Sequence, residues 1–417
     1  HFGSEWYVSS DGDQLNGDGS ASNPLSSVLA AINLANEGNE IIVSEGTYTG
    51  IGNYDIYFLG KGVTVRSAGE AVNTILDGQD QDRIMLFEPH GSYSGATDNT
   101  VIEELTIYNG QLQGDEQKGG GIYIHTASPV INNCIIANNR VYDTSGGWSR
   151  VRGGGVYAYN SNAVFNNVTF RNNELYGRTD HSYDDSSAHG AGIYVAGGNV
   201  QLVNCTIKEN NAHAQDDSSN GNSYGSARGG GVFYTEGGTL TIVGTQISNN
   251  QLNFDGHQEE RTGGGIYTDS GTLNITSTTI SNNDYEGITR HGGDVIVDQS
   301  TIVFNGSYGL YGDAITVTNS IIWSNGNNDN GSINYTYTNR QGSAPGGEGN
   351  ISKDPWFVDS GGQNFNLKPG SVCINRGNIN EIDSDGTRRD MGAHIYEHTH
   401  FGSEWYVSSD GDQLNGD

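Results

Sequence analysis

The sequence predicts an all-β solenoid, a right-handed parallel β-helix, on three observations. Blocks of alternating apolar and Thr or Ser residues recur and end in asparagine, a pattern typical of short strands with one face inward. A glycine triplet followed by an apolar-aromatic pair, as in GGGIY at 119–123, recurs in phase with these blocks. The shortest repeat, from Asn305 to Asn325, is 20 residues, enough for three short strands at roughly 3.3 Å per residue. Two blocks in constant order predict a parallel coil.

The final asparagines of the blocks define an aligned column. Residues at one aligned position lie one strand spacing apart, ~4.8 Å, so their amides can form a hydrogen-bonded ladder. Asparagine also tolerates the left-handed conformation of a sharp corner. We therefore expect a structural role for this column: Asn139, Asn173, Asn210, Asn250, Asn283, Asn305 and Asn325.

Two of the three cysteines also share an aligned position. Cys134 and Cys205 are two coils apart, which corresponds to ~9.6 Å and exceeds the reach of a disulfide. Both are predicted to be small buried apolar residues.

The predicted organisation along the chain has five parts. An N-terminal strand with an Asp/Gly loop (1–23) precedes a capping helix (24–36), coils (37–340) and a C-terminal cap (341–397). The helix is expected from Pro24 to Ala35, with proline at its first position after Asn23, and it would cover the open strand edge of the first coil. Residues 398–417 form a linker and a further segment.

That last segment repeats the start of the chain. HFGSEWYVSSDGDQLNGD stands at 1–18 and again at 400–417. The identity has three candidate causes: a tandem array with a period of 399 residues, an engineered duplication of one end, or a segment exchanged between subunits. With about eleven coils at ~4.8 Å each, one unit would add roughly 50 Å of rod. The partners expected on this basis are copies of the same chain.

Charge excludes several classes of partner. Asp and Glu total 49 against 19 Lys and Arg, a net charge of −30. Nucleic acids and anionic membrane surfaces require a cationic face, so neither is expected. No run of eighteen apolar residues occurs, so no segment is predicted to be embedded in a membrane. The charge suits an extracellular surface or divalent-cation binding.

Large insertions fall at one place in the coil, after the asparagine and before the glycine triplet. Because coils stack, these insertions are expected to stack as loops in a lateral lobe, and loops on a rigid scaffold commonly carry function. Its candidate polar residues are Asp180, His181, Tyr183, Asp184, Asp185, His213, Asp216, Asp217 and His257. Its aromatic candidates for sugar stacking are Tyr142, Trp148, Tyr183 and Tyr224.

A basic residue precedes most glycine triplets: Lys118, Arg152, His189 and Arg228, with Arg261 one position earlier. As alternative catalytic residues they would serve a polysaccharide lyase, in which a base removes the proton next to a uronate carboxylate and a cation neutralises that carboxylate. Charge pairing between this column and the aspartates of the insertions is the favoured interpretation.

Two acidic stretches suggest calcium, which prefers six to eight hard oxygen ligands. The candidate ligands are Asp11, Asp13, Asn16 and Asp18 in the first stretch, and Glu381, Asp383 and Asp385 in the second. Plain Asp-Gly turns are the alternative. Among the glycosylation sequons, the expected acceptors lie outside the regular coils at Asn330, Asn334 and Asn350.

The start of the chain contains EWYVSSDGDQLNGDG and IIVSEGTY, and its end contains DPWFVD, LKPGS and DMGAHIYE. In these motifs both ends resemble those of secreted right-handed parallel β-helix repeat proteins of the bacterial and archaeal surface. Met391 and Val372-Cys373 depart from the usual residues of that pattern. The family includes lyases, hydrolases, adhesins and structural proteins, so the resemblance implies architecture and an extracellular or cell-surface location more than activity.

The leading functional hypothesis is a structural repeat unit of an extracellular filament or giant adhesin, without catalysis. The alternatives are an extracellular polysaccharide lyase or hydrolase, and a carbohydrate-binding module.

Overall fold

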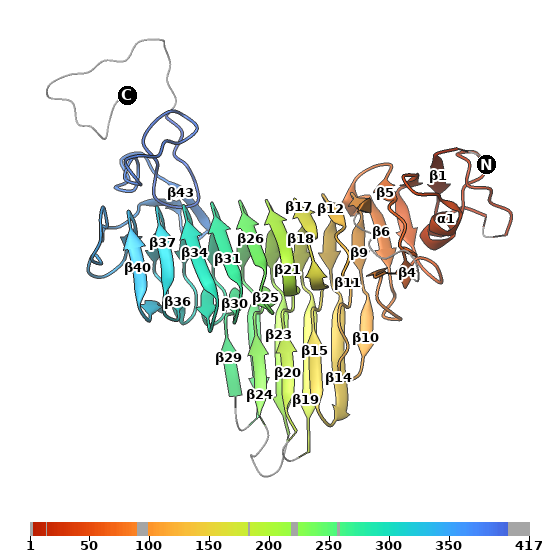
Figure 1. Cartoon of the computed structure of the whole chain (residues 1–417), viewed down its shortest axis with the longest axis horizontal. Helices are drawn as coiled ribbons and strands as arrows, with labels where there is room; N and C mark the ends of the chain where they lie inside the picture. The colour runs from red at the N-terminus through yellow and green to blue at the C-terminus, as the bar shows by residue number, and fades with distance from the viewer. Residues whose placement is uncertain are drawn as a thin grey trace.

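The computed structural model describes residues 3–13, 15–89, 99–181, 184–217, 224–256 and 259–398, with the backbone alone for Glu259. It is a right-handed parallel β-helix, which confirms the predicted fold class (Figure 1). No helix in these residues is long and apolar enough to cross a membrane.

Each coil contributes to three faces that run along the rod. The first face starts with β1 and continues through β2, β5, β8, β12, β17, the second half of β21, β26, β31, β34, β37 and β40. The strands of this face are Glu5–Val8, Glu40–Val43, Thr64–Ser67, Val101–Glu103, Val130–Asn132, Val164–Asn166, Ile193–Val203, Thr239–Val243, Thr272–Thr276, Asp294–Asp298, Ile315–Thr318 and Ile333–Thr336.

The second face joins the first through β21, so that the two form a 21-stranded sheet among the described residues. Its other strands are β4 (Ile56–Tyr57), β7 (Met85–Phe87), β11 (Ile122–His125), β16 (Val156–Ser161), β25 (Val232–Thr235), β30 (Ile266–Thr268), β33 (Ile288–Arg290), β36 (Tyr308–Tyr311) and β39 (Asn327–Asn330).

The third face is an 11-stranded sheet in the described part of the chain, one strand per coil, which agrees with the expected number of coils. A short 3-10 helix, η1 (Ala71–Asn73), precedes its second strand. The strands are β3 (Gly46–Tyr48), β6 (Thr74–Asp77), β9 (Thr106–Tyr108), β13 (Ile135–Ala137), β18 (Thr169–Arg171), β22 (Thr206–Lys208), β27 (Gln246–Ser248), β32 (Thr279–Ser281), β35 (Thr301–Val303), β38 (Ile321–Trp323) and β41 (Asn339–Arg340).

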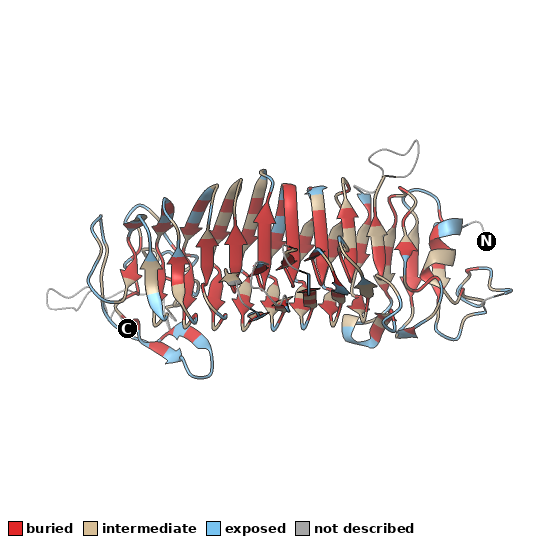
Figure 2. Ribbon diagram, turned by 90° about the horizontal axis from the view of Figure 1, so that it is seen from below, coloured by how far each residue is buried: buried red, intermediate tan, exposed pale blue. Residues whose placement is uncertain are grey.

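The core follows from the alternation in the sequence. In β26, Leu240 and Ile242 point inward and are fully buried, while Thr239 and Thr241 remain partly exposed. Repetition of this pattern gives one apolar core along the rod, visible as a continuous buried band in Figure 2. Each such Val, Leu or Ile contributes roughly 1.5–3 kcal/mol by its removal from water.

The seven aligned asparagines hydrogen-bond from each coil to the next. In every pair the side-chain amide donates to Oδ1 of the following asparagine, at 2.8–3.0 Å. The left-handed residue of the corner, however, is the one before the ladder asparagine, such as Asn138 (φ 55°) or Phe304 (φ 57°). The expectation that the ladder asparagines adopt this conformation is therefore wrong, because their side chains point inward and their own N–H groups bond along the ladder.

The glycine triplets occupy crowded corners, as predicted. The first glycine of each has a left-handed backbone, with φ of +64° at Gly153 and +61° at Gly229, a conformation that favours glycine. A Cβ atom on the second, Gly120, would lie 2.7 Å from the carbonyl oxygens of Arg140 and Gly154. Backbones of successive coils therefore stack here without space for a side chain.

The capping helix α1 is shorter than predicted and spans Val28–Leu34. Ser27 is its N-cap, and its hydroxyl accepts the N–H of Ala30 at 3.2 Å. Pro24 does not start the helix, because Leu25 next to it runs alongside β1 and donates its N–H to Tyr7 O. Lys61 closes the other end by donating to the carbonyls of Ile32, Asn33 and Ala35.

The insertions form strands where the sequence predicts loops. They build a flat projection of two sheets, called the fin below, which extends from the middle of the rod (Figure 1). Its apolar side chains, such as Val141, Leu175 and Phe254, form a second core. The strands are β10 (Gln111–Gln113), β14 (Arg140–Gly146), β19 (Glu174–Thr179), β23 (Asn211–Asp216) and β28 (Gln251–Asp255), and in the other sheet β15 (Ser149–Arg152), β20 (Ser186–His189), β24 (Gly225–Arg228) and β29 (Glu259–Thr262).

The C-terminal segment folds over the last coils. The antiparallel hairpin of β42 (Phe357–Asp359) and β43 (Asn364–Leu367) packs into a third apolar cluster with Cys373 and Met391. All three cysteines are buried and free, as predicted for Cys134 and Cys205. The repeated segment 400–417 lies outside the described residues.

Candidate functional site

The aligned basic residues lie where the fin joins the rod. Strand pairing places Arg152 beside His189 and His189 beside Arg228, and Lys118 forms a bridge with Arg152. Arg261 pairs with Ala227 and so lies one position away from this column. The glycine triplets that follow turn the chain sharply into the second face of the rod.

An aromatic column runs beside the basic one, and the sequence reasoning missed it. It consists of Tyr123, Tyr157, Tyr194, Phe233 and Tyr267, which stack with centroid separations of 5.5, 5.1, 4.8 and 5.0 Å. The signal for this column is the aromatic residue that follows each glycine triplet and its apolar residue.

Each basic residue packs against the ring of the next coil. Lys118 Nζ lies 5.5 Å from the ring centre of Tyr157, and Arg152 Cζ lies 5.9 Å from that of Tyr194. Arg228 approaches Tyr267 at 5.3 Å, and the His189 ring stacks on Phe233 at 4.7 Å. The cation–π contacts of Lys118, Arg152 and Arg228, together with the ring stacking of His189, hold the column in place.

His189 differs from its neighbours in charge. Burial, together with the positive charges of Arg228 and Arg152, lowers the pKa of His189 well below its usual value. Its ring is therefore neutral at pH 7, and Nε2 contacts Ser226 Oγ at 2.9 Å.

Glutamates pair with the cations, in place of the predicted aspartates of the insertions. Glu116 lies 3.7 Å from Lys118 and 3.3 Å from Arg152, and Glu260 pairs with Arg228. The aspartates of the fin bind elsewhere: Asp180 and Asp217 pair with Arg178 at 3.3 and 2.7 Å. The difference arises because the fin strands carry the aspartates away from the corner where the cations lie.

These residues line a groove in the corner between fin and rod. One section has a volume of about 410 Å³, with Asp55, Asp82, Arg83 and Glu88 in its wall. The next section, about 370 Å³, has Arg152, Tyr157, Tyr159, Tyr194 and Glu236 in its wall. Both sections include Lys118 and Tyr123, so the groove continues along the rod axis across several coils.

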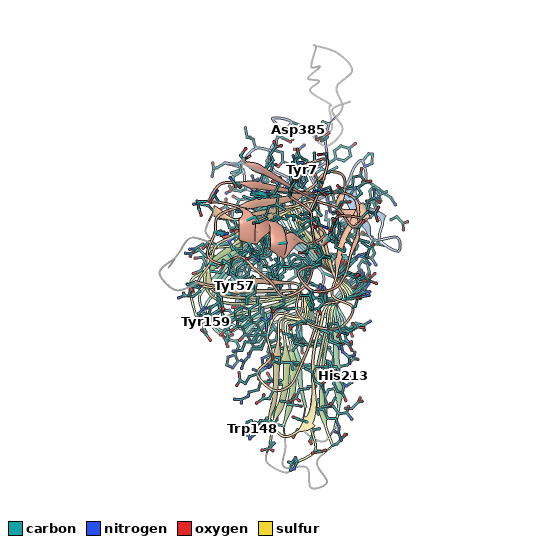
Figure 3. The ribbon with its side chains drawn as sticks, turned by 90° about the vertical axis from the view of Figure 1, so that its right-hand side faces the viewer. Tyr7, Tyr57, Trp148, Tyr159, His213 and Asp385 are labelled. Carbon is teal, nitrogen blue, oxygen red and sulfur yellow. The ribbon has the colours of Figure 1, made fainter. Side chains whose placement is uncertain are left out.

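Three tyrosines, Tyr157, Tyr159 and Tyr194, line this groove. Among the described residues, no hydrogen bond is found to the hydroxyls of Tyr157, Tyr159 or Tyr194. Burial raises the pKa of Tyr194 to about 12, so its hydroxyl stays protonated and can donate. Figure 3 shows Tyr159 on the same side of the molecule as Trp148, with His213 on the other side.

The remaining fin candidates are dispersed. Trp148 is 47% exposed, with Arg150 Cζ 5.7 Å from its ring centre. Tyr224 donates its hydroxyl to Glu260, and His213 pairs with Asp255 at 3.1 Å. Asp143 and Asp216 are buried within the fin, Asp185 Oδ1 accepts the N–H of Tyr224, and His181 lies 2.9 Å from Asp180. Tyr183 and His257 lie outside the described residues.

The candidate calcium ligands accept hydrogen bonds from the protein. Asp13 accepts from the N–H groups of Leu15 and Asn16, and Asp18 accepts from that of Ser20. Asp383 accepts from the N–H of Asp390 and Asp385 from that of Thr387. Within the described residues, no group of three His, Cys, Asp or Glu is placed to hold a metal ion. Calcium binding at Asp11, Asp13, Asn16 and Asp18 or at Asp383 and Asp385 stays a prediction.

Two sequons lie in coil strands and not outside them. Asn330 ends β39 and Asn334 belongs to β40, and both are exposed. Asn350 uses its side chain in hydrogen bonds with Thr338 N, Tyr335 O and Gly346 O. Glycosylation of Asn330, Asn334 and Asn350 stays a prediction, and a glycan on Asn350 would replace one of the two Nδ2 hydrogens that donate in these bonds.

The stacked coils describe a β-helix protein, and the groove runs along several of its coils. The chain belongs to the family described as the right-handed beta helix region, whose sequence model matches residues 25–252.

Solved structures that are similar to this chain include a pectate lyase and a rhamnogalacturonan lyase. The crystal structure of pectate lyase Pel9A has 17% sequence identity and a TM-score of 0.51, and the match covers 94% of this chain and 96% of that one. A rhamnogalacturonan lyase has 11% identity and a TM-score of 0.35, over 86% and 91% of the two chains. The likeness to the pectate lyase shows the shared fold alone. No curated protein sequence matches the chain.

Proposed function

We propose that this protein binds an extended polysaccharide lengthwise in the groove between fin and rod, outside the cell or at its surface. The observation that carries the proposal is the repetition of the same groups at three successive coils. Tyr123, Tyr157 and Tyr194 each present a hydroxyl, with ring centres 5.5 and 5.1 Å apart. A cation lies over each of these rings. A polymer of sugar rings, aligned with the rod, meets an equivalent donor and acceptor set along its length.

The charges of the groove distinguish between sugars. Asp55, Asp82 and Glu88 make one section acidic, which disfavours uronates there and suits sugar hydroxyls that donate to carboxylates. The other section is lined by Lys118, Arg152 and Glu236. Both of its cations also pair with Glu116 of the first section, so the charges of these four residues balance. A neutral or sparsely charged polysaccharide fits both sections.

Affinity electrophoresis in gels that contain xylan, β-glucan, arabinan, polygalacturonate or alginate tests the proposal. We expect retardation by at least one polymer. Replacement of Tyr157, Tyr159 and Tyr194 by phenylalanine removes three hydroxyls, each worth about 1 kcal/mol as a hydrogen bond, and should weaken binding by roughly 100-fold.

The matched control is Tyr311→Phe, an exposed tyrosine on β36. This variant should bind like the unmodified protein. Equal retardation of the triple variant and the control, or no retardation by any of the five polymers, would contradict the proposal.

A second candidate function is cleavage of a uronate polymer by β-elimination. The observation in its favour is that Lys118 and Arg152 lie partly exposed in one section, beside the hydroxyl of Tyr157. Arg152 would neutralise the uronate carboxylate while Lys118 takes the adjacent proton. The bond to the leaving sugar oxygen then breaks as the double bond forms, and that oxygen takes a proton from water. Incubation with polygalacturonate or alginate should then release unsaturated products that absorb in the ultraviolet, and Lys118→Ala should abolish them.

The filament hypothesis rests on the repeated segment alone. Because residues 400–417 lie outside the described residues, the groove supports carbohydrate binding more directly than it supports a purely structural role.

A further inference from the structure

We propose a second carbohydrate site, separate from the groove, between the last coils and the C-terminal segment. It is a pocket of about 390 Å³ that would take a single pyranose ring. Its walls are Phe304, Trp323, Ser324, Asp354, Trp356, Phe357, Ser360 and Lys368. Small-molecule sites of this size commonly combine an apolar lining with a few polar groups.

Trp356 is the central residue of this pocket. Its side chain is 54% exposed, and its backbone is left-handed, with φ of 54°. This conformation is rare for a bulky residue. Asp354 Oδ1 accepts the Trp356 N–H at 2.9 Å, and the Trp356 carbonyl accepts the Lys368 N–H at 2.9 Å. Strained positions that the surroundings hold so firmly tend to occur at ligand sites.

The floor of the pocket is rigid. Phe304 and Trp323 are half-buried and pack against the apolar cluster that joins the hairpin β42–β43 to the coils. Phe304 stacks on Phe365 with ring centres 5.9 Å apart, and Phe365 meets Phe357 edge-on at 5.4 Å. A ligand ring would therefore meet a preformed aromatic surface.

Polar groups at the rim complement the aromatic ones. Asp354 and Lys368 are both exposed. Among the described residues, no ion pair is found for either side chain, and the second carboxylate oxygen of Asp354 has no hydrogen-bond partner. A pyranose has an apolar C–H face for the indole of Trp356 and hydroxyls at its edge for these two groups. The site therefore suits a hydroxyl-rich sugar, and Lys368 would add affinity for a uronate.

This pocket lies apart from the groove. The C-terminal segment folds over one end of the rod, on the side away from the fin (Figure 1). The residues that line the pocket and those that line the groove do not overlap. The inference therefore does not depend on the proposed function of the groove.

Titration of the full chain with cellobiose, xylobiose, chitobiose and digalacturonate, followed by tryptophan fluorescence, tests the inference. We expect a saturable change with at least one sugar. Trp356→Ala should weaken this binding at least 10-fold, because the stacking surface is lost. The matched control is Trp148→Ala, an exposed tryptophan on the fin, which should leave the affinity unchanged.

A second variant keeps the test decisive if Trp356→Ala perturbs the hairpin. Lys368→Ala should weaken digalacturonate binding more than cellobiose binding. The triple phenylalanine variant of the groove should leave both affinities unaltered, so failure at one site is distinguishable from failure at the other. Unchanged affinity in Trp356→Ala and Lys368→Ala, or the absence of saturable binding by all four sugars, would overturn the inference.

Discussion

The side-chain amide of Asn210 donates to Oδ1 of Asn250 at 2.9 Å, across 40 residues of sequence. Asn210 Nδ2 also donates to the carbonyl of Phe170, and its Oδ1 accepts from the backbone and side chain of Asn173. Asn210 is completely buried. One residue thus connects three successive coils, and the insertion in each coil can vary in length without disturbing this connection.

Replacement of Asn210 by alanine should destabilise the protein by roughly 3 kcal/mol, because several buried polar groups lose their partners. Urea unfolding followed by circular dichroism measures this change. The control is Asn162→Ala, which removes an exposed amide contact with Asn199. This substitution should change the free energy of unfolding by no more than about 0.5 kcal/mol. Equal effects of the two substitutions would refute a stabilising role for the ladder.

The three cysteines should be unreactive in the folded protein. Burial raises the pKa of the thiols to about 12 at Cys134, about 11 at Cys205 and about 12 at Cys373, so almost no thiolate is present at neutral pH. An aromatic disulfide reagent should detect no thiol at pH 8. As a control, it should detect all three thiols in 6 M guanidinium, a concentration that unfolds all but the most stable proteins. Rapid reaction of any thiol before unfolding would contradict the buried placement.

The stability of the last coils should depend on pH through the carboxylate of Asp329. Arg340 donates to both of its carboxylate oxygens at 2.6 Å, and the Tyr335 hydroxyl donates to one of them. Burial raises the pKa of Asp329, but the hydrogen bonds from Arg340 and Tyr335 outweigh it and hold the pKa below its usual value. Because the folded state lowers this pKa, the stabilisation is present above about pH 4, the unfolded value, and is lost as the pH falls further.

Asp329→Asn should therefore lower the free energy of unfolding by about 2 kcal/mol at pH 7, which is the scale of a hydrogen bond to a charged group. The difference between variant and unmodified protein should shrink as the pH falls below 4. Urea unfolding at a series of pH values measures it, with Asp313→Asn, at an exposed turn, as the control. A difference that stays constant down to pH 2 would contradict the assignment.

The sequence predicted those parts of the fold that repeat. The coil strands, the asparagine column and the glycine corners each recur, so alignment of the repeats recovers their geometry. Features that occur once were harder to predict. The capping helix begins after Ser27 because Leu25 pairs with the backbone of β1. Helix propensity does not take such a tertiary contact into account. The insertions resembled loops because their lengths differ, yet Val141, Leu175 and Ala212 lie in register inside the fin.

The basic column that lines the groove was predicted, but the groove itself was not. The column of Lys118, Arg152, His189 and Arg228 followed from alignment, whereas its packing on the tyrosines did not. That packing depends on which face of β11, β16 and β21 points outward at the corner, and the corner angle is set by the left-handed glycines. The pairing with Glu116 and Glu260 depends on the same angle.

The repeated segment provides the last prediction. In β1, Trp6 and Val8 are buried, and the strand pairs in parallel with β2 at the N-terminal end of the rod. Residues 404–407 have the same sequence, Glu-Trp-Tyr-Val, so we predict that this segment can take the place of β1 beside β2 in a second copy of the chain. Sedimentation of the full chain should show association that increases with concentration, whereas a chain that ends at residue 398 should remain monomeric. If both sediment as monomers at all concentrations, the repeat does not join separate chains, and a tandem arrangement within one longer chain becomes the better explanation.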